Sequence, residues 1–219
     1  MKPRLIQFSS VVVGQSHNPS ILNPDFLAAE GIVPKSWDWK VAETLTTPPL
    51  SMVRYENGVI ITVEVAKLQV TDPNVEDGPT KSKVGEIASA YVKTLRHVRY
   101  TAVGNNFQSL VPMESPESFL KELFLKEGPW NNSERPLEAA GVRLVYPLNP
   151  GKLTLSIDSG EAKLPNDAEK QSVVLANANF SRDCADHPAF EEVCVFLQKA
   201  MKDWAMYEAL VGDVLKAAY

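Results

Sequence analysis

Two stretches rich in β-branched residues flank the dipeptide Asn57-Gly58, within a run that covers residues 50–72. Asn-Gly favours the positive φ angles of a tight hairpin turn, and alternation of apolar residues on both sides of it is a strong local signal for two paired antiparallel strands. This hairpin is the feature that most constrains the fold. We expect it to lie centrally in a sheet against which the helices pack.

The spacing of apolar residues in the hairpin also predicts its register. A two-residue loop would divide the large β-branched residues between both faces of the sheet. A three-residue loop at 56–58 instead pairs Tyr55 with Val59 and collects those residues on one face, with Gly58 in the left-handed position of a turn and bulge. The predicted core residues are Val53, Tyr55, Val59, Ile61 and Val63, whereas Arg54 and Glu64 lie outside the core.

Further strands and helices are predicted from periodicity and capping residues. Strands are expected at 4–13, 99–107 and 172–180, with a second hairpin whose apolar residues alternate over 142–148 and 153–157 around a four-residue loop at 149–152. Residues 15–49 are expected to be irregular, apart from a short helix that Asn23 caps and Gly31 ends. Amphipathic helices are predicted from Val84 to Leu95, from Ser115 to about Gly128, and from about Pro188 to Lys216.

These elements predict one α+β domain over residues 1–219, with a largely antiparallel sheet of about seven strands and helices on one face. The final helix would be roughly 40 Å long, so either Gly212 breaks it or its end packs on a partner. The order of elements in residues 1–97 resembles that in 98–219. This order fits an internal two-fold duplication, and chance similarity between two αβ halves explains it as well.

Composition narrows the classes of function. Acidic residues outnumber basic ones by 27 to 22, and the resulting net charge of −5 argues against a general affinity for nucleic acid phosphates. Two cysteines are too few for a disulfide framework, no long apolar segment predicts a membrane span, and no signal-like start is present. We therefore expect a reduced cytoplasmic protein without a cofactor.

The cluster of reactive side chains at residues 182–188 is the weak candidate for catalysis. Cys184 and His187 have the spacing of a metal pair or of a thiolate with an activating imidazole. The alternative is that Asp186 caps the last helix and Cys194 lies on its apolar face. We predict no metal site, since four suitable ligands are not at hand, and the sequence carries none of the familiar catalytic motifs.

The polar face of the predicted sheet is a candidate binding surface. Its predicted ligand-binding residues are Arg54, Arg99, Asn105, Arg143, Asn177 and Asn179. Arginines interleaved with amides could receive an anion, a nucleotide or a nucleic acid. Simple solvation of that face is the alternative.

The leading functional hypothesis is a non-enzymatic binding or assembly protein that acts through protein–protein contacts or self-association. The predicted partner-binding residues on the final helix are Met201, Trp204, Tyr207 and Val211. The alternative for this stripe is the protein's own core.

Overall fold

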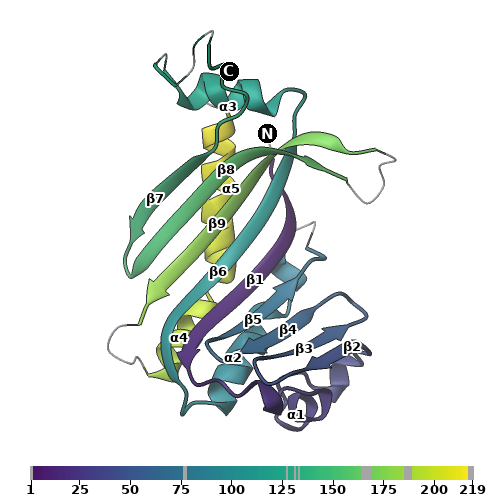
Figure 1. The fold of residues 1–219 in the computed structure, drawn as a ribbon. Coiled ribbons are helices and arrows are strands. Elements are labelled where there is room, and N and C mark those ends of the chain that lie inside the picture. The colour runs from purple at the N-terminus through teal and green to yellow at the C-terminus, as the bar shows by residue number, and fades with distance from the viewer. Residues whose placement is uncertain are drawn as a thin grey trace.

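Two long strands, β1 (Arg4–Gln15) and β6 (Arg99–Pro112), run antiparallel through the middle of the sheet (Figure 1). The computed structural model describes residues 2–75, 78–126, 128–130, 132, 134–163, 169–184 and 189–216. The other strands are β2 (Val41–Thr46), β3 (Leu50–Tyr55), β4 (Ile60–Glu64), β5 (Lys67–Asp72), β7 (Val142–Leu148), β8 (Gly151–Ala162) and β9 (Gln171–Asp183). The α-helices are α1 (Pro24–Ala29), α2 (Val84–Thr94), α3 (Pro116–Phe124), α4 (Phe190–Leu197) and α5 (Ala200–Lys216).

The described strands form a single antiparallel sheet of nine strands in the order β2-β3-β4-β5-β1-β6-β9-β8-β7. Counted outwards from the central pair, the first half of the chain gives β1, β5, β4, β3, β2 and the second half gives β6, β9, β8, β7. The α+β class and the antiparallel sheet are as predicted. None of the helices in the described part of the chain is both long and apolar enough to cross a membrane.

The hairpin of β3 and β4 has the predicted register. Tyr55 N–H donates to the Val59 carbonyl at 2.9 Å, Val53 lies opposite Ile61, and Gly58 has φ +91°. All five predicted core residues are buried and Arg54 is exposed. The expected central position is wrong, because β3 and β4 are the second and third strands from one edge of the sheet.

Two strands account for the difference between seven and nine. The chain turns again after Glu64, so that Lys67–Asp72 forms β5 beside β1. Val41–Thr46, expected to be irregular, forms the edge strand β2, in which every residue is exposed. A strand without a buried face has no apolar alternation, which is the signal that sequence reading depends on.

The second hairpin also differs from its prediction. Leu148 lies opposite Gly151, so the loop between β7 and β8 contains two residues and not four. The shift equals two residues of register, which leaves every side chain on its predicted face. Leu153, Leu155 and Ile157 are therefore buried, as expected.

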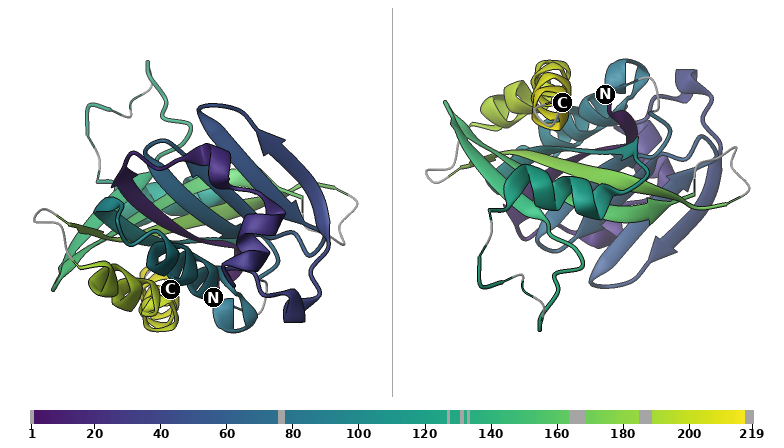
Figure 2. Two further views of the ribbon diagram at one scale, coloured as in Figure 1. Left: turned by 90° about the horizontal axis from the view of Figure 1, so that it is seen from below. Right: turned by 90° about the horizontal axis from the view of Figure 1, so that it is seen from above.

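Helices α2, α4 and α5 lie on one face of the sheet, and α3 contacts β8 and β9 (Figures 1 and 2). The predicted apolar face of the α2 segment is buried at all six positions, which are Val84, Ile87, Ala88, Tyr91, Val92 and Leu95. Asn23 caps α1 by accepting a hydrogen bond from Phe26 N–H, and Gly31 follows α1 with φ +66°, both as predicted.

The long final helix is broken, and the break is not at Gly212. Helix α4 ends at Leu197 and α5 begins at Ala200. The Phe196 carbonyl, which would accept from Ala200 in a continuous helix, instead accepts from Lys199 N–H at 3.0 Å and from Asn105 Nδ2 at 3.4 Å. A side chain that takes a carbonyl out of the helical ladder is a recognised cause of a kink.

Candidate functional site

A shallow hollow of about 350 Å³ lies over the middle strands, on the face opposite to α2, α4 and α5. Its polar lining comes from five neighbouring strands, β5, β1, β6, β9 and β8. We call this surface the amide face. It consists of Gln7, Ser9, Gln69, Asn106, Gln108, Thr154, Ser156, Asn177 and Asn179.

The sheet register arranges most of these side chains in two rows that cross the strands. In one row, Ser9, Asn106, Asn179 and Thr154 lie opposite one another in turn. In the other row, the side chains that lie opposite one another in turn are Gln7, Gln108, Asn177 and Ser156. The rows are two residues apart along each strand, a separation of about 6.6 Å.

Hydrogen bonds order part of the first row. Asn179 Nδ2 donates to Asn106 Oδ1, and Asn106 Nδ2 donates to Ser9 Oγ at 3.4 Å. Both amides use one N–H, so each keeps a second one. Gln7, Gln108 and Asn177 make no side-chain hydrogen bond to another residue that the structure describes. The amide face therefore presents donors and acceptors that a ligand can use.

The hollow has no charged residue among those that line it. Soluble globular domains contain about 25% charged residues, most of them on the surface. Nearby charges lie on the same strands but farther along them, such as Lys152 and Asp158 on β8. A neutral, hydrogen-bonding ligand fits this surface better than an ion does.

Of the six predicted ligand-binding residues, Asn177 and Asn179 belong to the amide face. The three arginines do not converge. Arg54 is on β3, within 3.7 Å of Glu43, and Arg143 is on β7, seven strand spacings or about 33 Å away along a flat sheet. Arg99 lies at the beginning of β6, opposite Gln15. Alternation predicts the face of a residue, but it does not give the order of the strands.

Asn105 lies on the wrong face for the predicted site. Its side chain is fully buried on the helix side of the sheet. Val13 lies opposite Ala102 while Gly14 lies opposite Tyr100, so β6 has one extra residue at Thr101. This irregularity inverts the alternation that the sequence suggested from Tyr100 onwards.

The predicted partner stripe on the final helix is mostly core. Trp204, Tyr207 and Val211 are buried, and only Met201 of the four is exposed. Tyr207 stacks on Phe107 with ring centroids 5.9 Å apart, and its hydroxyl donates to the Ala176 carbonyl at 2.8 Å. The three buried side chains are occupied inside this protein and are not available to a partner.

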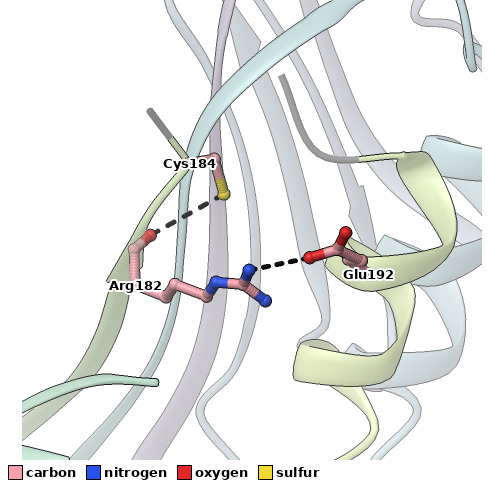
Figure 3. Close-up of polar contacts among 3 residues, drawn as sticks. All are labelled: Arg182, Cys184 and Glu192. Atoms are coloured by element: carbon pink, nitrogen blue, oxygen red, sulfur yellow. Dashed lines mark hydrogen bonds and ion pairs between the residues drawn. The ribbon is translucent and has the colours of Figure 1, made fainter. Parts of the chain in front are cut away.

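The cysteine cluster forms no catalytic arrangement among the described residues. Figure 3 shows Arg182, at the end of β9, paired with Glu192 of α4 at 2.7 Å, and Cys184 Sγ 3.9 Å from the Arg182 carbonyl oxygen. Burial raises the pKa of the Cys184 thiol, which disfavours the reactive thiolate. His187 and Asp186 lie outside the described residues.

Potential metal ligands do not gather in the part of the chain that the structure describes, where no group of three His, Cys, Asp or Glu side chains could hold an ion. Cys194 is on the buried side of α4, and its Sγ lies 3.6 Å from the Ser89 carbonyl of α2. It therefore has the packing role that was the alternative to a metal ligand.

Comparison of the chain with protein-family models gives no match, and comparison with curated proteins gives no significant one. The candidate site consequently rests on its geometry and chemistry. The Asn and Gln residues of β1 and β6 on the amide face were missed by sequence reading. Their only signal is a repeated uncharged polar residue at every second position, Asn106 and Gln108 in β6 and Gln7 and Ser9 in β1.

Proposed function

We propose that this protein is a non-enzymatic binding protein that holds an extended polypeptide segment on its amide face. The observation that carries the proposal is the pair of uncharged polar rows spaced two residues apart. An extended peptide repeats its backbone groups every two residues, or about 6.6–6.8 Å. A peptide parallel to β6 would thus meet Asn106 and Gln108 at its own repeat, and on β9 it would meet Asn179 and Asn177.

Carboxamides suit this ligand chemically. A side-chain amide presents a carbonyl oxygen and an N–H in one plane, and it can both accept from and donate to a peptide bond. The ligand is then recognised through its main chain, as in other modes of binding extended peptides. Partner binding, the leading hypothesis from the sequence, is kept, but its location moves from the final helix to the sheet.

Nucleic acid ligands are less well supported. Phosphates need Lys or Arg, and neither type is found among the described residues that line the hollow. Bases stack on exposed aromatic rings. Of the described residues that line the hollow, Phe107 is the one aromatic. Its ring packs in the core, with its centroid 5.1 Å from that of Phe8 and 5.9 Å from that of Tyr207.

Three further proposals accompany this function. A duplication of residues 1–97 and 98–219 is supported by the similar outward order of strands from β1 and from β6. A reducing, cytoplasmic location is supported by two buried free thiols.

A second copy of this chain is the alternative partner to an unrelated polypeptide. Light scattering at increasing protein concentration distinguishes the two, because self-association raises the measured mass.

The test uses a panel of unrelated linear peptides with uncharged side chains, each synthesised with a fluorophore. Affinity for the full chain is measured by anisotropy. Replacing Asn106 and Asn179 together by alanine should weaken binding about 10- to 100-fold, since each lost hydrogen bond is worth about 0.5–1.5 kcal/mol. The matched control is Gln198→Ala, which removes an exposed carboxamide on the helix side and should leave affinity unchanged.

Peptide chemistry gives a second readout. Scrambling the sequence of a bound peptide should change its affinity little, because the main chain is recognised. Methylating every second backbone nitrogen should abolish binding. Three results would contradict the proposal. The first is that no peptide of the panel binds the full chain. The second is full affinity in the double variant while circular dichroism shows a native fold, and the third is binding that survives N-methylation.

A further inference from the structure

A second cavity, of about 300 Å³, lies between the β7–β8 turn and the junction of α4 with α5. It is on the helix side of the sheet and shares no side chain with the amide face. Much of its wall is apolar. The apolar side chains are those of Leu148, Pro150, Phe180, Phe196 and Met206.

A buried chain of polar side chains ends at this cavity. Ser10 Oγ donates to Asn105 Oδ1 at 2.8 Å, and Asn105 Nδ2 donates to Asp203 Oδ2 at 3.1 Å. Ser10 and Asn105 are fully buried, and buried polar groups are costly unless each one is hydrogen-bonded. The chain crosses the core from β1 through β6 to α5 and fixes one oxygen of the Asp203 carboxylate. Its other oxygen has no protein donor among the described residues.

Cationic side chains line the same cavity. Lys202 lies next to Asp203 in the first turn of α5, Lys199 immediately precedes that helix, and Lys152 at the start of β8 also lines the cavity. Neither Lys199 nor Lys202 forms an ion pair with Asp203 within the described part of the chain. Burial raises the pKa of Asp203, while the hydrogen bond from Asn105 and the two lysines lower it. The cavity therefore offers one anchored acid, separate basic groups and an apolar wall.

We propose that this cavity binds a free α-amino acid with an apolar side chain. Its ammonium group donates to the open oxygen of Asp203, its carboxylate pairs with Lys199 or Lys202, and its side chain lies against Phe180 and Met206. A volume of about 300 Å³ is at the small end of ligand pockets, which suits a molecule of this size.

Ligands with a single charge fit less well. A simple fatty acid would bring its carboxylate close to Asp203 without an ammonium to compensate. A simple alkylamine would place its charge near Lys199 and Lys202 without a carboxylate to pair with them. Only a zwitterion satisfies both kinds of group, and an apolar side chain is required because the remaining wall is apolar. The proposal does not depend on peptide binding at the amide face.

Isothermal titration calorimetry on the full chain tests the site. The probes are L-leucine, isoamylamine, which lacks the carboxylate, 4-methylpentanoate, which lacks the ammonium, and L-glutamate, which has an acidic side chain. Leucine should bind at least about tenfold more tightly than the other three, a difference of about 1.4 kcal/mol.

Variants assign the groups. Asp203→Asn should weaken leucine binding about tenfold or more, and its side-chain oxygen can still accept from Asn105, so the fold is retained. Lys199→Gln combined with Lys202→Gln should also weaken it. Asp213→Asn is the matched control, because Asp213 is an exposed carboxylate on the same helix outside the cavity, and its affinity should be unchanged.

Several outcomes overturn the proposal. One is an absence of heat with leucine up to about 10 mM, where a Kd of about 1 mM gives a clear signal. Another is isoamylamine or 4-methylpentanoate that binds as tightly as leucine. Undiminished leucine binding by Asp203→Asn, with a native circular dichroism spectrum, is the third.

Discussion

Replacing Gly58 by alanine should destabilise the protein more than the same replacement at Gly31. Both glycines have positive φ, +91° at Gly58 and +66° at Gly31. They differ in their surroundings. A Cβ at Gly58 would lie 2.5 Å from Asn74 Nδ2 and 3.2 Å from Pro73 Cγ, whereas a Cβ at Gly31 meets no atom within 4 Å.

The magnitude follows from two contributions. A left-handed conformation costs an L residue roughly 1–2 kcal/mol, and both variants incur this cost. At Gly58 the Asn74 side chain must also move, which breaks its 2.6 Å hydrogen bond to the Asn57 carbonyl. That loss adds about 0.5–1.5 kcal/mol. We expect about 2–3 kcal/mol for Gly58→Ala and about 1–2 kcal/mol for Gly31→Ala.

Equilibrium unfolding in urea, followed by tryptophan fluorescence, measures both costs. With an unchanged dependence on urea, the midpoint shift of each variant converts directly into a free energy. A double-mutant cycle adds Asn74→Ala. Measured against Asn74→Ala alone, the cost of Gly58→Ala should fall to about that of Gly31→Ala, because the hydrogen bond and the clashing side chain are already absent. Equal costs for the two glycine variants, or a larger cost at Gly31, would refute the assignment of the loop at 56–58 and its contact with Asn74.

Two other predictions concern buried titratable groups. His17 is buried near Tyr91 and Tyr100, at centroid distances of 6.1 and 6.0 Å, and burial lowers its pKa from the usual 6.5. As the pH falls, the unfolded chain therefore binds a proton at His17 before the folded protein does. The free energy of unfolding should fall below about pH 6.5, by up to about 1.4 kcal/mol per pH unit. Urea titrations at several pH values measure this, and the His17→Leu variant should lose the dependence. Cys184 and Cys194 are buried, and burial raises the pKa of both thiols. Neither should react with Ellman's reagent near neutral pH until urea unfolds the chain. Fast reaction of either thiol in the folded protein would contradict this.

Local spacing was enough to predict several elements correctly. The register of the first hairpin, the buried face of α2 and the cap of α1 at Asn23 are all as expected. Each depends on residues within a few positions of one another, where the periods of the strand and helix and the chemistry of turns act directly. The second hairpin shows the limit, because alternation fixed its faces but not its loop length, which changed by two residues without moving any side chain to the other face.

Strand order, the bulge at Thr101 and the break before α5 were decided by contacts between residues far apart in the chain. Strand order separates Arg54 from Arg143 and brings β1, β6 and β9 together, which creates the amide face. The bulge turns Asn105 into the core, where its hydrogen bond to Phe196 accompanies the break in the final helix and its bond to Asp203 builds the second cavity. The sequence alone determined which residues tend to be buried and which to be exposed. The tertiary structure decided which of the exposed and buried polar groups meet, because that depends on pairing across the sheet and not on spacing along the chain.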